Sequence, residues 1–231
     1  MKAAVQAGES HLSTASDTSV LRVWHSKLAL SARASVACES PEVMHQLVTR
    51  GWGDSPIRES DQRSVLYAAE RSPTDAERGC GLTGRPSGLL VQSGEEPDWR
   101  GLIRDGVLAS AHPERVEQVW RRGERAELRV SASPLVSRNG TNGKLARREL
   151  LRTREECRTW FCTHLKRAGC TPILASIEVA DAERTRAHGR TITFRSFRAT
   201  VKISDPERFH ALLVSGMGRN RAWGAGLVLA R

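Results

Sequence analysis

The chain has 231 residues, of which 39% are apolar, and it carries a formal net charge of +10 with a pI near 10.2. This length holds one large domain or two small ones, and the apolar fraction is ordinary for a protein with a folded core. Its 36 Lys and Arg against 26 Asp and Glu favour a polyanionic partner over a basic surface that is merely solvated. No apolar run approaches the length that spans a bilayer, and no secretion signal is evident, so we expect no membrane partner.

The cysteines argue against two kinds of stabilising site. There are five of them, an odd number, and no Cys-x-x-Cys pair occurs. Neither a disulfide framework nor a zinc site is supported, and a reducing cytoplasm fits best. We therefore expect a cytoplasmic protein whose cysteines are mostly small buried apolar side chains.

After a polar extension, the first half of the chain alternates strands and helices. Residues 1–20 are rich in Ser, Thr, Ala and Gly and have no periodicity, which predicts a disordered extension. The elements expected next are, in chain order, a strand over 21–30, a helix over 40–51, strands over 64–70 and 87–93, and helical segments over 96–108 and 113–120. No clear strand closes this half.

The helix over 40–51 carries a candidate functional side chain. Ser40 is a good N-cap and Pro41 fits the first helical position. An apolar stripe with i, i+3, i+4 spacing is formed by Met44, Leu47 and Val48. At about 100° per residue, His45 falls on the flank of this stripe, on the same side as Glu42, where solvent or a ligand can reach it.

The second half repeats the alternation with clearer signals. Thr153 and Glu156 form a capping box at the start of the best-defined helix. A change of apolar phase between Phe194 and Phe197 predicts a bulge or bend in a long strand. The expected elements are a strand over 123–134, a basic connection over 137–152, a helix over 153–169, a strand over 172–180, a basic loop over 183–190, a strand over 191–204, a helix over 204–216 and a last strand over 226–230.

The order strand, helix, strand, strand, helix thus occurs twice, and the second copy ends in a strand. This is the βαββαβ order of the ferredoxin-like fold. We predict an α+β protein of two tandem ferredoxin-like, RRM-like domains, over 21–122 and 123–231, after the extension over 1–20.

The segment SGMGRNRAWGAGLVLAR, over 215–231, places glycines next to arginines just before the last strand. Its glycines are Gly216, Gly218, Gly224 and Gly226. Such glycines either bend the chain between helix and strand, or let a ligand approach the main chain beside Arg219 and Arg221. The segment has neither the dinucleotide-binding fingerprint nor the Gly-Lys-Ser/Thr of a P-loop, so we expect neither ATP nor NAD as a cofactor.

A family resemblance rests on this segment. Its Gly-x-Gly-x-x-basic-small-x-Gly-x-Gly-Leu pattern, after a helix that opens with Asp-Pro-Glu, resembles the signature of the CasE family, the CRISPR repeat-processing endoribonucleases of the type I-E Cascade complex. LLVQSGEEPDW (89–99) and GERAELRVSASPLVSRNG (123–140) are similar to two further family stretches, with Ser133 in place of an asparagine. The helix around Trp160 matches in place and type, so the resemblance spans roughly residues 21–231.

The resemblance implies two tandem ferredoxin-like domains and cleavage of precursor CRISPR RNA at the repeat hairpin, without metal or another cofactor. It also implies that the enzyme stays on the mature crRNA beside other Cascade subunits. In metal-free cleavage a 2′-hydroxyl attacks the adjacent phosphate and a 5′-hydroxyl leaves, which requires a base, an acid and nearby cations. No carboxylate cluster in the sequence suggests a two-metal nuclease instead.

The resemblance assigns the catalytic histidine to His45, which otherwise reads as an ordinary surface histidine. Family members carry a tyrosine three residues earlier, where this chain has Glu42. A glutamate there either raises the pKa of His45 or serves as a base, and it also repels phosphate. A non-catalytic RNA-binding subunit of the same superfamily is therefore the alternative function, and a basic interaction module without RNA is a weaker third.

Basic segments are expected to hold the RNA. Arg184, Arg186 and Arg190 lie where the family uses a basic loop against the hairpin. A second basic stretch contributes Arg147 and Arg148. The predicted RNA-binding set is completed by Arg219, Arg221, Gly216, Gly218, Gly224 and Gly226. Trp223 is either core or a stacking surface, and His188 in the basic loop is expected at most to touch RNA.

Overall fold

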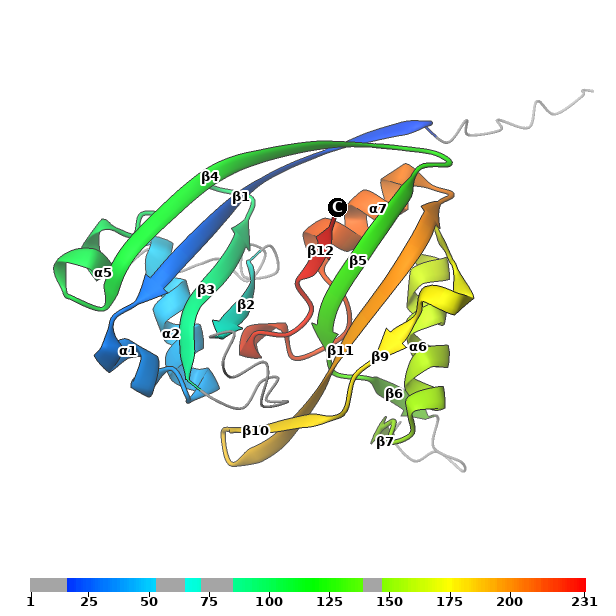
Figure 1. The fold of residues 1–231 in the computed structure, drawn as a ribbon. Helices are drawn as coiled ribbons and strands as arrows, with labels where there is room; N and C mark the ends of the chain where they lie inside the picture. The colour runs from blue at the N-terminus through cyan, green and yellow to red at the C-terminus, as the bar shows by residue number, and fades with distance from the viewer. Residues whose placement is uncertain (1–15, 53–64, 72–84, 139–146) are drawn as a thin grey trace, which may run out of the picture.

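The computed structural model describes residues 16–52, 65–71, 85–138 and 147–231, and within these ranges it confirms the predicted α+β class. Two antiparallel sheets lie beside one another and carry the helices between and around them (Figure 1). No helix among the described residues is long and apolar enough to cross a membrane.

The first sheet has the strand order β2–β3–β1–β4. Its strands are β1 (Thr18–Leu30), β2 (Leu66–Arg71), β3 (Pro86–Ser93) and β4 (Leu108–Arg121). Its helical elements are α1 (Ala32–Ala37), α2 (Pro41–Thr49), η1 (Arg50–Trp52) and α5 (Arg100–Arg104). The chain order of these elements is βαββαβ, as the ferredoxin-like fold requires.

The second sheet has the order β10–β11–β5–β12, and β8 and β9 also pair with β11. Its strands are β5 (Arg125–Ala132), β8 (Cys170–Pro172), β9 (Glu178–Val179), β10 (Glu183–Ala187), β11 (Arg190–Ile203) and β12 (Val228–Ala230). The helical elements of this half are α6 (Arg154–Arg167), η2 (Leu174–Ser176), α7 (Pro206–Ser215) and η3 (Arg221–Trp223). A separate hairpin consists of β6 (Leu135–Arg138) and β7 (Arg147–Leu150). The single strand predicted over 172–180 is therefore interrupted by η2.

Local signals for the helices are confirmed. The Thr153 side chain accepts from the backbone N–H of Glu156, and the Glu156 side chain bonds back to Thr153, so the capping box is complete. Ser40 accepts from the backbone N–H of Val43 at the start of α2, with Pro41 in the first turn. The predicted apolar stripe of α2 is buried in the core of the first half.

The helical segment predicted over 113–120 is wrong, because these residues form most of β4. They pair with β1 from Ser26↔Pro113 to Ser19↔Trp120. Val116 and Trp120 stand four residues apart, a spacing that places both on one face of a strand as well as of a helix. Both side chains pack against the core of the second half, which fits either a helix or a strand. The backbone pairing with β1 makes this segment a strand. β4 thus supplies the closing strand that the sequence left unclear.

The phase change predicted to mark a bulge in β11 has another cause. β11 pairs with β10 from Arg190 to Phe194 and continues with β5 from Arg195 to Lys202, without a register shift in either pairing. Phe197 packs in the main core of the second half, whereas Phe194 packs on the opposite face with a separate cluster that includes Ala225. Both faces of the strand are therefore covered near this point.

β1 and β4 form a long ribbon that reaches over α7 of the second half (Figure 1). Leu21, Val23 and Trp120 lie in the core that β5 and β11 build. The Trp120 ring meets the Phe209 ring of α7 edge to face, with the ring centroids 5.3 Å apart. The predicted boundary at 122/123 falls between β4 and β5, and the division into domains stays a prediction, because the ribbon shares its core with the second half.

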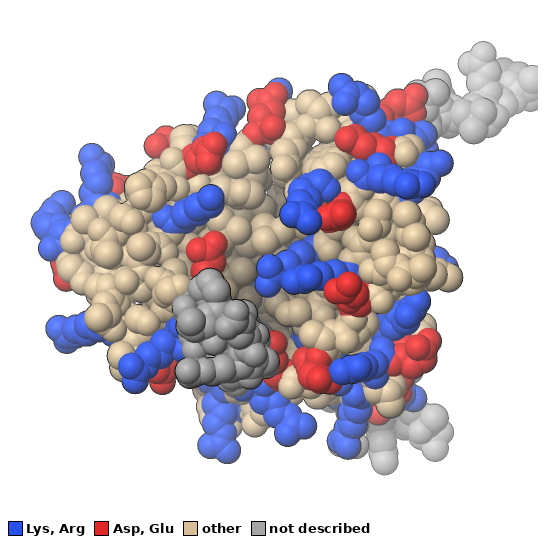
Figure 2. All heavy atoms as spheres, viewed as in Figure 1, with Lys and Arg blue, Asp and Glu red and all other residues tan. Residues whose placement is uncertain are grey.

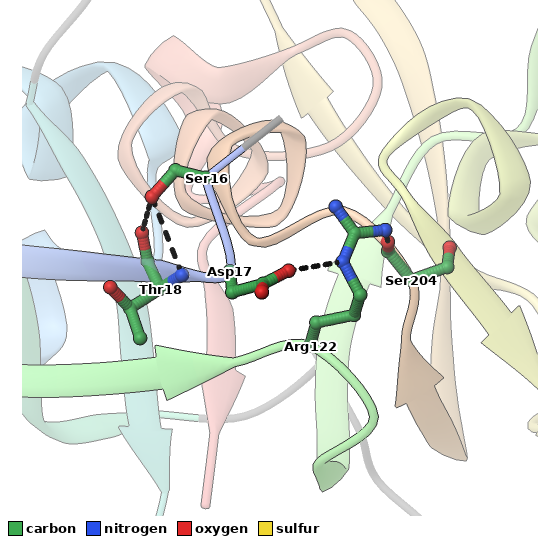
Figure 3. Close-up of polar contacts among 5 residues, drawn as sticks. All are labelled: Ser16, Asp17, Thr18, Arg122 and Ser204. Carbon is green, nitrogen blue, oxygen red and sulfur yellow. Dashed lines mark hydrogen bonds and ion pairs between the residues drawn. The ribbon is translucent and has the colours of Figure 1, made fainter. Parts of the chain in front are cut away.

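The end of the ribbon is tied to the second half by Arg122 (Figure 3). Its Nε donates to Asp17 Oδ1 at 2.8 Å, and its Nη1 donates to the carbonyl of Ser204 at 2.5 Å. Nearby, the hydroxyl of Ser16 donates to the carbonyl of Thr18 at 2.6 Å. The first strand begins at Thr18, inside the range predicted to be a disordered extension, because these residues pair with the end of β4. The rest of that extension, residues 1–15, lies outside the described residues.

Candidate functional site

The candidate site is centred on the indole of Trp223, which lies in η3 of the glycine-rich segment. The ring of His45, from α2, meets it edge to face with the centroids 5.7 Å apart. The ring of His188, from the turn between β10 and β11, meets it edge to face at 5.0 Å. α2 packs against both η3 and β10, so three segments far apart in the sequence meet at this point.

His45 occupies the predicted flank of α2 and is half-buried. The neighbouring stripe faces the core, which fixes the rotation of the helix and turns His45 toward the second half. Among the described residues, neither ring nitrogen of His45 has a hydrogen-bond partner. Burial, and secondarily the nearby charge of His188, hold the pKa of His45 below its ordinary value of 6.5. The imidazole is therefore neutral at neutral pH and has a free nitrogen that can accept a proton.

Glu42 lies one helical turn before His45, and both of its carboxylate oxygens are occupied. The hydroxyl of Ser40 donates to Oε2 at 2.7 Å, and the backbone N–H of His188 donates to Oε1. These two hydrogen bonds are the main causes that keep the pKa of Glu42 below its ordinary value. The expectation that Glu42 raises the pKa of His45 fails, since that pKa is lowered. Instead Glu42 joins the start of α2 to the β10–β11 turn.

The segment expected as a basic loop over 183–190 is the β-strand β10, followed by a tight turn into β11. Ala187 pairs with Arg190, which leaves His188 and Gly189 as the two loop residues. Their φ angles are 47° and 69°, both positive. This is the signature of a type I′ hairpin turn, which suits the right-handed twist of the strands. The turn presents the exposed His188 side chain beside Trp223.

The turn splits the predicted group of three arginines between two faces. Arg184 and Arg186 are exposed and alternate with Thr185, so they share one face of β10. Arg190 lies opposite Ala187, on the other face, toward the cluster that packs with Trp223. Only Arg190 of the three therefore shares a face with the candidate site.

The four glycines of the C-terminal segment all have positive φ, between 72° and 89°. A Cβ on Gly224 would lie 3.1 Å from Cε2 of Tyr67, and one on Gly226 would lie 2.7 Å from the carbonyl oxygen of Met217. The hydroxyl of Tyr67 donates to the carbonyl of Ala222 at 2.6 Å, so β2 of the first half is fastened to η3. The glycines thus allow close packing that positions Trp223, and an RNA contact by them stays a proposal.

The two arginines of this segment differ in whether the side chain has a hydrogen-bond partner among the described residues. Arg221 donates through Nη1 to the carbonyl of Ser215, at the end of α7. Arg219 is exposed, and its backbone forms an isolated bridge with Ser133 of the chain after β5. Arg219 is therefore the freer of the two to meet a ligand.

The second predicted basic stretch lies in the β6–β7 hairpin, just before α6 (Figure 1). Arg148 is exposed and pairs through its backbone with Ser137. Arg147 pairs through its backbone with Arg138, and the side chain of Arg147 lies outside what the structure describes.

Sequence reasoning missed the cations on the open face of the second sheet. Arg129 lies directly opposite Arg198, and Arg125 directly opposite Lys202, all four exposed. Like charges directly opposite each other destabilise a sheet. Figure 2 shows basic and acidic side chains interspersed over the region that β5 and β11 occupy in Figure 1. Only the alternation of basic residues within the strands hinted at this surface.

Among the described residues, no group of three or more His, Cys, Asp or Glu side chains is gathered as metal ligands would be. Sequence reasoning identified His45 but not its two ring neighbours as parts of one site. Trp223 remained ambiguous between core and stacking surface, and His188 was expected only as an RNA contact. The contacts that unite them link residues whose sequence separation gives no local signal.

Comparisons with known proteins identify the family and the fold of this chain. Residues 23–231 match the family described as CRISPR associated protein. The CRISPR-associated endoribonuclease Cse3 of Thermus thermophilus is 26% identical over 223 residues, which cover 89% of this chain and 98% of that protein. The structure of Thermus thermophilus Cse3 bound to an RNA representing a pre-cleavage complex has a TM-score of 0.75 at 23% identity, covering 91% of this chain and 100% of that one. A chain of a CRISPR RNA-guided surveillance complex has a TM-score of 0.55 at 17% identity, covering 90% and 98%. The two structures share the fold of this chain, which confirms the tandem ferredoxin-like prediction.

Proposed function

The chain belongs to the CRISPR-associated protein family, and from that membership we propose that it is an endoribonuclease that cleaves precursor CRISPR RNA at the repeat hairpin. The observation that carries the proposal is the placement of His45, half-buried where the two halves meet and with unpartnered ring nitrogens among the described residues. The 26% identical relative is named an endoribonuclease, which supports the same class of activity.

The proposed chemistry uses the substrate as its own nucleophile. Neutral His45 takes the proton of the 2′-hydroxyl, and the 2′-oxygen attacks the adjacent phosphorus. The P–O5′ bond breaks, leaving a 2′,3′-cyclic phosphate and a 5′-hydroxyl. A base that is neutral at physiological pH suits this step, and the lowered pKa of His45 favours that state. The mechanism needs no metal ion.

Glu42 is proposed to support catalysis by position. With both oxygens engaged and its pKa lowered, the carboxylate is a weak proton acceptor. Its hydrogen bonds instead hold the β10–β11 turn against the start of α2. These bonds keep the β10–β11 turn of the second half in a fixed position relative to His45.

The RNA is proposed to be held by arginines around the site. The exposed Arg184, Arg186 and Arg148, with Arg190 and Arg219 nearer the site, offer charge to phosphates. Arg147, Arg221 and the four glycines complete the proposed set. Because a structurally similar chain is part of a CRISPR RNA-guided surveillance complex, we further propose that the protein stays on its mature crRNA and contacts other Cascade subunits.

Incubation with repeat hairpin RNA in excess EDTA tests this function. We expect cleavage that persists in EDTA, leaves cyclic phosphate ends, and is abolished by His45→Ala. His112→Ala, at an exposed position on β4, is the matched control and should cleave like the unchanged protein. Loss of cleavage in EDTA would refute metal independence, and unchanged cleavage by His45→Ala would refute the assigned base.

The alternative is a non-catalytic RNA-binding subunit. It is favoured by one observation, that the position of the family tyrosine holds Glu42, whose oxygens are both occupied. Tight binding of the hairpin without any turnover would select this alternative.

A further inference from the structure

We propose that His188 is the second catalytic residue, the acid that protonates the leaving 5′-oxygen. This inference rests on the proposed function, since it assigns the acid for the same cleavage. His188 and His45 come from opposite halves of the chain, and both form T-shaped contacts with the indole of Trp223, with ring centroids 5.0 Å and 5.7 Å away. The indole thus sets the two imidazoles into one site.

The geometry suits a base and an acid acting on one phosphate. In an in-line displacement the entering and leaving oxygens stand on opposite sides of phosphorus, so the two catalytic groups must approach from different directions. His45 projects from α2 and His188 from the β10–β11 turn, two elements that pack against each other across the junction. His188 is exposed, and its ring has no hydrogen-bond partner among the described residues.

The backbone of His188 supports a functional role for its side chain. Its φ of 47° lies in the left-handed region, which only a few per cent of non-glycine residues adopt, with asparagine, aspartate and histidine the most frequent among them. At the first loop position of a type I′ turn, asparagine, aspartate or glycine is the favoured choice. Strain of this kind concentrates at functional sites, where the side chain is needed despite its cost.

Glu42 fixes the place of that turn. It accepts the backbone N–H of His188 on one oxygen and the Ser40 hydroxyl on the other. The turn is therefore held through its main chain, which leaves the imidazole free. This arrangement also separates two effects in an experiment, since a substitution at position 188 other than proline keeps the backbone N–H that donates to Glu42.

The charged groups that face the pair come from α2, β11 and η3. Glu42 faces His188 from α2, and the two attract each other, because the charge of His188 helps to lower the pKa of Glu42. The same charge helps to lower the pKa of His45, so the two imidazoles interact electrostatically. From the other elements, Arg190 shares the face of the hairpin that meets the site, and Arg221 of η3 is engaged with the carbonyl of Ser215.

His45 accepts the proton of the 2′-hydroxyl while the P–O2′ bond forms. The P–O5′ bond breaks, and protonated His188 transfers its proton to the 5′-oxygen. The products are a 2′,3′-cyclic phosphate and a 5′-hydroxyl, and both imidazoles regain their starting protonation by exchange with water.

His188→Asn is the variant of choice, because asparagine is favoured at this loop position and preserves the turn. We expect its single-turnover cleavage rate to fall by at least about 100-fold, the usual contribution of an acid catalyst, with little change in RNA affinity. A substrate with sulfur in place of the 5′-bridging oxygen has a leaving group that needs no proton. We expect this substrate to restore His188→Asn to near the rate of the unchanged protein and to leave His45→Ala inactive.

The outcomes separate this inference from the proposed function. If the unchanged protein does not cleave, the proposed function fails. If it cleaves and His188→Asn cleaves equally well, only the role of His188 is refuted. If His188→Asn loses affinity for RNA at an unchanged cleavage rate, or is not rescued by the sulfur substrate, His188 is an RNA contact or a structural residue and the inference is overturned.

Discussion

Gly216→Ala tests whether the glycines of the C-terminal segment serve close packing. Gly216 follows α7 with φ 72° and ψ 178°, a region that is essentially restricted to glycine and costs other residues about 1–3 kcal/mol. A Cβ there would lie 2.6 Å from the carbonyl oxygen of Gly226 and 3.0 Å from both Cδ atoms of Leu66. The carbonyl cannot easily retreat, because it accepts the backbone N–H of Met217 at 2.8 Å. Overpacking of this kind costs roughly 1–3 kcal/mol.

The reduced entropy of the unfolded chain offsets roughly 0.4–1 kcal/mol of this cost. We therefore expect Gly216→Ala to destabilise the protein by about 1–5.6 kcal/mol, which in a chain of this length lowers the Tm by about 2–22 °C. Thermal denaturation followed by circular dichroism measures the change.

Gly189→Ala is the matched control. Gly189 has a similar φ of 69°, but apart from its two chain neighbours no atom of the described residues lies within 4 Å of the Cβ position, so only the backbone strain remains. That strain costs about 1–2 kcal/mol before the same entropy offset. Equal losses of Tm in the two variants would show that conformational freedom alone explains the glycines, and the close-packing account would be refuted.

Three further predictions concern cleavage and RNA binding. Glu42→Gln should keep the cleavage rate within about threefold, because an amide oxygen can still accept the His188 N–H, whereas Glu42→Ala should lose at least about tenfold; equal losses would indicate a proton-transfer role instead. The single-turnover rate should fall as pH drops through a midpoint below 6.5, because His45 acts in its neutral form and its pKa is lowered, so a midpoint above 6.5 would contradict the assigned base. Arg186→Ala should weaken hairpin binding and reduce the slope of log affinity against log salt by about 1, while Arg22→Ala, at an exposed residue paired with Glu117, should change neither; an unchanged slope for Arg186→Ala would exclude a phosphate contact.

The sequence predicted helices and strands correctly wherever the interactions that determine them lie between residues close in the chain. The capping box of α6 and the N-cap of α2 involve neighbours within three residues, and both were readable from the sequence. The alternation of β5 was equally clear, because one face of that strand is buried and the other is not. The repeated βαββαβ order followed from such elements, and with it the fold class.

Predictions failed where the structure of a segment depends on a partner far away in the sequence. The segment over 113–120 carries helix-forming charged residues, but its backbone hydrogen bonds go to β1, nearly a hundred residues earlier in the chain as the pairing Arg22↔Glu117 shows. The candidate site likewise depends on contacts between residues that are far apart in the sequence. The bond from His188 to Glu42 spans 146 residues, and that from Tyr67 to Ala222 spans 155. No pattern within a helix or a strand can predict which turn will meet which helix.

The placement of the two imidazoles depends on the contacts that join the halves. The Gln92 side chain of β3 donates to the carbonyl of Leu213 in α7 at 2.8 Å, and the Tyr67 hydroxyl fastens β2 to η3. The β1–β4 ribbon adds Leu21 and Trp120 to the core beneath β5 and β11. Since a misplacement of about 1 Å can cost an enzyme two orders of magnitude in rate, a base on one half and an acid on the other require a rigid joint. The shared core and the close approaches at Gly216, Gly224 and Gly226 provide that rigidity, so the glycine segment beside the proposed chemistry also helps to join the two halves.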